Sequence, residues 1–293
     1  MFQGGQVILR LAGIFILLAL GLNLALGVAG LLDLGFAASF GLSAYLTALL
    51  TAKFDITIAL LLGAAMGAFF GWLKGGLARR LRSDFFAVAT LAFGLLVRQV
   101  IINLEFTGGM GGIGGITAPH ILGFSLAGQM QRYYLVFFVI VLLAWVSQQI
   151  ISSRTGRAWM ALSDDELAAL SVGVDVNLAR TRALMISSAM AGMAGVLYAS
   201  TLSFVEPDLM AFHVSSMILT MVILGGAGSV PGALIGAVTI ILYDKVFVPQ
   251  LANWLALIWP VAIGSVPDIR GASFFNFGIA LYLTVLIRSR RRS

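Results

Sequence analysis

Asp33 is the residue whose type and place in the sequence most suggest a chemical role. It lies in the segment GLLDLG, residues 30–35, between two long apolar blocks. A carboxylate in apolar surroundings is costly unless it is paired, and within a membrane such a residue is a functional candidate. The same carboxylate would also cap a helix that begins near Leu34. The pattern therefore leaves two roles open for Asp33, a site in a transport pathway and a helix cap.

Other polar residues near the apolar blocks could line a cavity for a small solute. Packing and interhelical hydrogen bonds are the alternative role of such side chains in membrane helices. Thr107 begins a glycine-rich run, residues 107–116, which either touches a partner, closes a pathway or is a flexible loop. The substrate-pathway candidates are Asn23, Asp33, Ser39, Ser43, Tyr45, Thr107, Ser215 and Ser216.

The segment that follows Ser152 contains the pattern of a short, firmly bounded helix. Ser163 and Glu166 have the spacing of a capping box, in which each side chain satisfies a backbone amide near the helix start. Asp164 and Asp165 suit the positive end of the helix dipole, and Gly173 supplies a stop. We therefore predict a helix over residues 164–172.

This predicted helix would carry Leu167 and Leu170 on one side and the small residues Ala168 and Ala169 between them. A short helix with such firm ends, set in a polar loop, is suited to contact with a partner protein. An ordinary capped connector between two helices has the same pattern. The sequence alone leaves both interpretations open.

The sequence offers no set of residues for covalent chemistry. No nucleophile and base occur in a recognisable arrangement, so we do not expect an enzyme. His120 and His213 lie far apart, neither has a second ligand at metal spacing, and there is no cysteine, so we expect no metal site. The three lysines follow Ala52, Leu73 and Asp244, so none belongs to a phosphate-binding G-K-[ST] sequence, and we expect no cofactor.

The elements that would position these residues are membrane helices. The chain is 60% hydrophobic and 10% charged, against roughly 25% charged residues in soluble domains. Its apolar blocks, such as Val7–Val28 and residues 133–151 and 183–202, have the length of about 20 residues that a bilayer span needs. We predict an all-α integral membrane protein, a polytopic bundle of about nine spans. A helix core within a large soluble complex is the alternative that these run lengths argue against.

Twelve of the 18 basic residues form three clusters, and this excess of +6 is best explained by membrane topology rather than by nucleic acid. Cytoplasmic loops concentrate Lys and Arg, and even numbers of predicted spans separate the clusters. We therefore expect all three clusters and the C-terminus in the cytoplasm, and the N-terminus outside. The clusters are Lys74, Arg79, Arg80 and Arg82; Arg154, Arg157, Arg180 and Arg182; and Arg288, Arg290, Arg291 and Arg292.

We expect one membrane domain over residues 1–293, with a cytoplasmic loop at 152–182 and no separate soluble domain. Residues 246–264 are interrupted by Pro249 and Pro260 and form either a span or an interfacial hairpin. Residues 26–50 and 224–242 share a glycine-rich break between apolar runs, which predicts broken or re-entrant segments. Chance similarity between two such segments is the alternative. A four-residue stripe of Ala191, Gly195 and Ala199 indicates close helix packing.

Four segments, in order along most of the chain, resemble the branched-chain amino acid transporter permeases of the LivM type, which belong to ABC importers. They are LNLALGVAGLLDLGFAASFGLSAYLTALL (22–50), TGGMGGIGGI (107–116), residues 153–199, and LGGAGSVPGALIGA (224–237). Within residues 153–199, Glu166 to Ala169 followed by Gly173 is similar to the motif of the coupling helix that contacts the ATPase. The chain differs from the family mainly in its brevity.

The resemblance implies a permease in the bacterial inner membrane that works by alternating access. Its partners would be a second permease subunit, two cytoplasmic ATPases and a periplasmic substrate-binding protein. ATP would be used by the partner chains, because this chain lacks a phosphate-binding loop. Branched-chain amino acids are the first expected substrates, and urea, short amides or aromatic acids are alternatives. A stand-alone channel or secondary carrier is a different class, and it would need no ATPase.

Overall fold

The computed structural model describes residues 2–50, 55–81, 83–116, 119–121, 124–126 and 128–250, and in these ranges the chain is almost entirely helical. The longer helices are α1 (Phe2–Leu22), α2 (Phe36–Leu50), α3 (Ile56–Ala78), α4 (Ser83–Asn103), α5 (Gln129–Ser152), α6 (Arg154–Asp164), α8 (Val176–Leu202), α9 (Phe212–Gly225) and α10 (Val230–Leu242). The short helical segments are η1 (Asn23–Val28), η2 (Glu105–Thr107), η3 (Gly109–Gly111), α7 (Glu166–Ser171), η4 (Pro207–Met210) and η5 (Tyr243–Phe247). Two antiparallel pairs join the two-residue strands β1 (Ile113–Gly114) with β4 (Phe204–Val205) and β2 (His120–Ile121) with β3 (Phe124–Ser125).

The prediction of an all-α membrane protein is confirmed in its main part. Six stretches of the described chain are long and apolar enough to cross a membrane: Val7–Val28, Ile56–Ala78, Phe85–Asn103, Gln129–Ser152, Val176–Leu202 and Val230–Gln250. Helices α2 and α9 are apolar but shorter. Most of residues 246–264, predicted as a span or a hairpin, and the third basic cluster lie outside the described residues.

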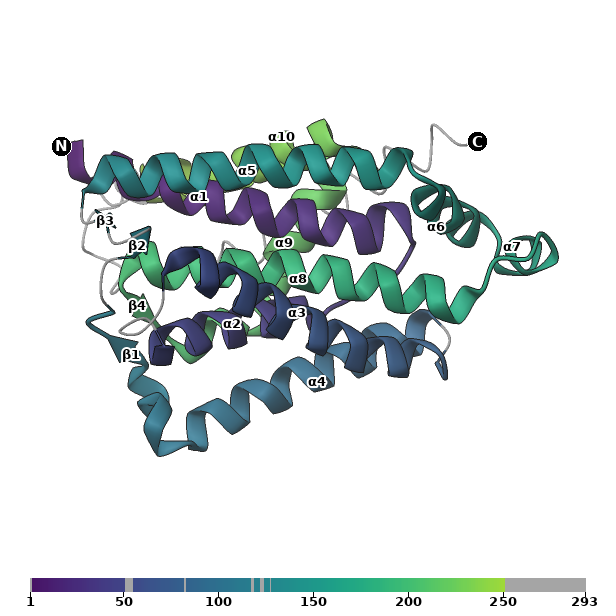
Figure 1. Ribbon diagram of the computed structural model, residues 1–293, viewed down its shortest axis with the longest axis horizontal. Coiled ribbons are helices and arrows are strands. Elements are labelled where there is room, and N and C mark those ends of the chain that lie inside the picture. Colours follow the sequence, from purple (N-terminus) through teal and green to yellow (C-terminus); the bar gives the residue numbers. More distant parts are fainter. Residues whose placement is uncertain are drawn as a thin grey trace, which may run out of the picture.

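Helices α1 and α8 form the centre of an elongated bundle, and α4 and α5 lie along its two sides (Figure 1), while α3 is also an outer helix by its low burial. In α1 and α8, 72% of the most apolar 18-residue stretch of the span is buried, whereas the corresponding share is 22% in α3 and in α5. The outer helices carry large apolar side chains on their exposed sides, among them Trp72, Phe138 and Trp145. Such outward apolar surfaces are what lipid-facing helices require.

Glycines bring α3 and α8 into direct backbone contact. A Cβ added at Gly67 would overlap the carbonyl oxygen of Ser188, and one added at Gly63 would approach the backbone of Gly192. On the other side of α8, Gly195 lies against the backbone carbonyl of Phe40 in α2. The predicted stripe therefore packs on α2 through Gly195, and a separate side of α8, which includes Ser188 and Gly192, packs on the glycines that occur at every fourth position of α3.

Two breaks interrupt the helices where the sequence predicted them. Helix α1 passes into the π-helical segment η1, and residues 29–35 are non-helical, with Gly30 at φ +69°. Between α9 and α10, residues 226–229 are non-helical, with Gly228 at φ +90°. A Cβ on Gly27 would overlap the backbone nitrogen of Gly228. The two segments that resemble each other in sequence therefore touch at their breaks.

Candidate functional site

Helices α6 and α7 lie at the end of the bundle opposite the N-terminus and the short strands (Figure 1). One residue, Asp165, joins them in extended conformation, with φ −155° and ψ 116°. Its carboxylate accepts hydrogen bonds from the backbone amides of Leu167 at 2.8 Å and Ala168 at 3.1 Å. Asp165 is therefore the N-cap of α7.

The predicted capping box is wrong by two residues. Ser163 and Asp164 form the last turn of α6, and Glu166 is the first residue of α7. The reason is that α6 is an amphipathic helix that continues to Asp164, with Trp159 and Leu162 buried. The chain can turn only after this helix ends, so the next carboxylate becomes the cap.

The predicted stop at Gly173 is confirmed, although α7 ends at Ser171 rather than at residue 172. Gly173 has φ +84°, its amide donates to the carbonyl of Leu170, and the amide of Val174 donates to that of Ala169, both at 3.0 Å. This pair of bonds is the Schellman motif, which requires a left-handed residue at the position of the glycine.

Helix α7 presents apolar side chains to its surroundings. Leu167 is 77% exposed and Leu170 is 50% exposed, while Ala169 faces inward and is buried. The carboxylate of Glu166 lies 2.6 Å from the guanidinium of Arg180 on α8, which ties α7 to the bundle. An apolar surface held on a fixed short helix suits contact with a partner protein.

The first two basic clusters meet at this same end of the bundle, as predicted. Arg180 Nη1 donates to the carbonyl of Ala78 at 3.3 Å, and Arg79 Nε donates to Thr181 Oγ1 at 3.2 Å. The assignment of Lys74 to a loop cluster is wrong. Its side chain is fully buried in α3, because it forms an ion pair with Asp33.

Asp33 makes the local contact expected of a cap and, in addition, a buried ion pair. Its Oδ1 accepts a hydrogen bond from the amide of Gly35 at 3.1 Å, just before α2 begins, and its Oδ2 pairs with Lys74 Nζ. Ser39 joins this group, because Lys74 Nζ also donates to its hydroxyl at 3.2 Å. The structure therefore brings together two of the predicted pathway residues and one lysine that was assigned elsewhere.

Three further pathway candidates tie helices and loops together, which is the alternative role left open for them. Asn23 bonds to Gly228 and Ser229, Ser43 to the carbonyl of Gly63, and Ser215 accepts from the amide of Ala37.

The last three candidates are Thr107, Ser216 and Tyr45, and their polar groups either bond within their own segment or have no described partner. The hydroxyl of Thr107 donates to Ile101 and Leu104, and the carbonyl of Ser216 accepts from Thr220 within α9. The hydroxyl of Tyr45 is buried and has no hydrogen-bond partner among the described residues.

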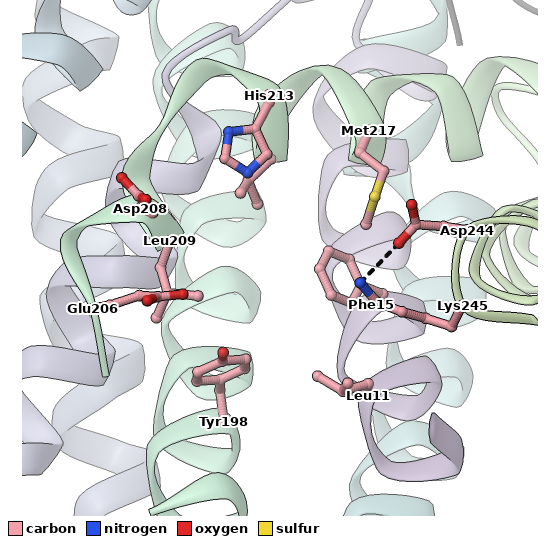
Figure 2. A pocket seen from close by; sticks show the side chains of 11 residues that line it. Leu11, Phe15, Tyr198, Glu206, Asp208, Leu209, His213, Met217, Asp244 and Lys245 are labelled. Carbon is pink, nitrogen blue, oxygen red and sulfur yellow. Dashed lines mark ion pairs between the residues drawn. The ribbon is translucent and has the colours of Figure 1, made fainter. Parts of the chain in front are cut away.

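A cavity of 310 Å³ lies toward the other end of the bundle, and none of the predicted pathway residues lines it. Figure 2 shows Glu206, Asp208 and Tyr198 on one side of it and Asp244 and Lys245 on the other. Its lining comes from α1, α8, η4, α9 and η5: Leu11, Phe15, Tyr198, Glu206, Asp208, Leu209, His213, Val214, Met217, Asp244 and Lys245.

The charged groups of this cavity differ in their partners. Asp208 pairs with Arg98 at 2.6 Å, and Lys245 pairs with Asp244 at 2.8 Å. The carboxylate of Glu206 has neither a hydrogen bond nor an ion pair with any part of the chain that the structure describes. The cavity thus combines apolar walls, charges of both signs and one carboxylate without a neutralising partner.

This cavity was not predicted from the sequence, although a signal was present. The chain has only 12 acidic residues, and two of them, Glu206 and Asp208, flank Pro207. Asp244 and Lys245 come from another break in the apolar pattern. Nothing in the sequence links residues 206–213 with residues 244–245, because only the packing of α8, α9 and η5 brings them together.

Comparisons with known proteins identify the family of the chain. The chain matches the family described as branched-chain amino acid transport system / permease component over residues 6–266. It is 33% identical over 265 residues to the high-affinity branched-chain amino acid transport system permease protein LivM of Escherichia coli (strain K12), and 32% identical to LivM of Salmonella typhimurium. These matches cover 82% of this chain and 62% of each LivM protein, so the chain spans less than two thirds of their length.

The chain is also 30% identical over 259 residues to the autoinducer 2 import system permease protein LsrC of Enterobacter sp. (strain 638). That match covers 84% of this chain and 72% of the LsrC protein. No solved structure matches the chain.

Proposed function

Because the chain belongs to the family of branched-chain amino acid transport system permease components, we propose that it is the membrane-spanning subunit of an ABC importer for branched-chain or related amino acids. It forms, over residues 1–293, one membrane domain in a bacterial inner membrane, with the loop 152–182 and the C-terminus in the cytoplasm. It catalyses no covalent step. Its partners are a second permease subunit, two ATPases and a periplasmic substrate-binding protein.

The observation that carries this proposal is the exposed apolar side of α7. Leu167 and Leu170 project from a helix that is capped at both ends and fixed to α8 by the Glu166–Arg180 pair. A partner protein that packs against these side chains can move the loop without unfolding it, because both helix ends are capped by hydrogen bonds. This is the role of a coupling helix, through which closure of the ATPase pair would act on the permease.

The cavity supports an amino acid as the substrate. A free amino acid carries an ammonium and a carboxylate, and the cavity offers Glu206 for the first and Lys245 for the second. Leu11, Phe15 and Met217 supply apolar surface for an aliphatic side chain. Aromatic acids, urea and short amides remain alternatives, since the related LsrC proteins are named for another substrate, autoinducer 2.

The proposal is tested by reconstituting the chain with its partner subunits in proteoliposomes and measuring uptake of radiolabelled leucine. We expect uptake to require hydrolysable ATP and the binding protein, and to be reduced by unlabelled isoleucine and valine. Phenylalanine, urea and acetamide, added in turn, identify the substrate class if leucine is not taken up. Uptake that continues without ATP would favour a stand-alone channel or carrier and would contradict the proposal.

A further inference from the structure

Asp33 and Lys74 form an ion pair whose two side chains are completely buried. Lys74 Nζ also donates to Ser39 Oγ at 3.2 Å and lies 5.9 Å from the centre of the Phe36 ring. Asp33 Oδ1 is bound by the amide of Gly35. Both charged groups therefore have additional polar or aromatic contacts, as a buried pair requires.

Stability alone does not account for such a pair. Replacing a buried ion pair with apolar residues of similar size is often neutral or stabilising, because the attraction barely offsets the desolvation of two charges. An ion pair differs from an apolar contact in being directional, whereas the hydrophobic effect is not. A pair at this position fixes the place of Asp33 relative to Lys74.

The segment that carries Asp33 touches α6. A Cβ added at Gly30 would lie 2.8 Å from Ser163 Oγ, so the backbone of the break between η1 and α2 rests on the last turn of α6. Helix α6 is anchored by the fully buried Trp159, and α7 follows it after the single residue Asp165. A displacement of α7 is therefore passed to the segment of Asp33 through one short helix.

The helix that carries Lys74 is also tied to α7, by a separate set of contacts. Glu166 at the start of α7 pairs with Arg180, and Arg180 donates to the carbonyl of Ala78, the last residue of α3. Lys74 lies four residues, about one helical turn, before Ala78. Two separate series of contacts thus begin at α7, and both end at the Asp33–Lys74 pair.

We propose that Asp33 and Lys74 are positioning residues for energy coupling, which rests on the proposed function. The pair holds the break between α1 and α2 to α3, so that a movement of α7 displaces both together and changes the opening of the pathway at this end of the bundle. Without the pair, α7 moves α6 and α8, but the break no longer follows α3. ATP hydrolysis then continues with less transport.

The test uses the complete importer in proteoliposomes and the double variant Asp33→Asn with Lys74→Met. This variant removes both charges, so no unpaired charge is left in the interior. Either single change would leave the other charge buried without its partner. The readout is the number of substrate molecules taken up per ATP hydrolysed, with the melting temperature of the complex measured in parallel. Ser147→Ala is the control, because it removes a buried hydroxyl whose bonds, among the described residues, lie within α5 and to Met190.

We expect the double variant to assemble and hydrolyse ATP, with uptake per ATP reduced about tenfold, within the usual range of coupling between sites. The control keeps the wild-type ratio. A double variant with the wild-type ratio overturns the proposal, and so does one that fails to assemble, because the pair would then serve the fold alone. If the wild-type complex itself shows no ATP-driven uptake, the proposed function fails, which is a different result.

Discussion

Asn23 and Gly228 join the two glycine-rich breaks of the bundle through one side chain. Asn23 Oδ1 accepts a hydrogen bond from the amide of Gly228 at 2.8 Å, and its Nδ2 donates to the carbonyl of Ser229 at 3.2 Å. Backbone that leaves the helix inside a membrane protein must find partners in the protein itself. Asn23 supplies them, and this explains how the breaks persist in an apolar interior.

Replacing Asn23 with leucine should therefore destabilise the protein strongly. The amide of Gly228 and the carbonyl of Ser229 would each lose a partner, and one unsatisfied buried polar group costs about 1–3 kcal/mol. The measurement is thermal unfolding in detergent, with Asn103→Leu as the control, because Asn103 is exposed and bonds only to Gln99 in its own helix. Equal melting temperatures for the two variants would show that Asn23 does not hold the breaks.

The contact between α3 and α8 leads to a second prediction. Gly67→Ala places a methyl group against the carbonyl of Ser188, so the two helices must separate, and we expect a loss of about 1–3 kcal/mol in the free energy of unfolding. Gly76→Ala is the matched control in the same helix, since no heavy atom lies within 4 Å of its added Cβ. The packing argument is wrong if both variants unfold at the same temperature.

The left-handed backbone conformation of Gly173 at the end of α7 gives a third prediction. Gly173 has φ +84°, which a β-branched residue adopts only with strain, whereas asparagine tolerates it. No heavy atom lies within 4 Å of a Cβ at this position, so bulk has no effect of its own. We expect Gly173→Val to loosen the end of α7 by about 1–2 kcal/mol and to lower uptake per ATP, and Gly173→Asn to keep both near wild type. If uptake per ATP is the same in the two variants, coupling does not depend on the shape of this turn.

The cavity gives a prediction for substrate recognition. Glu206→Gln removes the carboxylate that lacks a partner in the described chain, and we expect the KM for amino acid uptake to rise about tenfold, the size of one hydrogen bond to a charged group. Glu105→Gln is the control, because Glu105 is exposed on η2 and does not line the cavity. A KM unchanged by Glu206→Gln would remove the cavity from the transport pathway.

Local sequence patterns predicted the features that depend on a few neighbouring residues. The breaks at residues 29–35 and 226–229 and the stop at Gly173 follow from glycine, which alone adopts these backbone angles without strain. The start of α7 was misplaced because Ser163, Asp164 and Asp165 can all cap a helix, and the burial of Trp159 decides among them.

Features that depend on distant residues were not predictable in this way. Lys74 lies five residues before Arg79 and was grouped with it, but Asp33, 41 residues away in sequence, draws it into the core. The cavity likewise joins Glu206 to Lys245 through packing that no periodicity reveals. The sequence could thus indicate a membrane bundle and a short capped helix in its polar loop, but not which polar residues meet inside.

The claim that energy enters this subunit through α7 is tested most directly by ATP-dependent leucine uptake of the Leu167→Asp, Leu170→Asp variant in the reconstituted importer. The matched control is Ser171→Ala, an exposed position on the same helix whose hydroxyl bonds only to Ala168. We predict that uptake falls at least about tenfold, as for the loss of apolar anchors in an interface, while the variant still inserts and the control remains at the wild-type rate. Wild-type uptake by the aspartate variant would contradict the account.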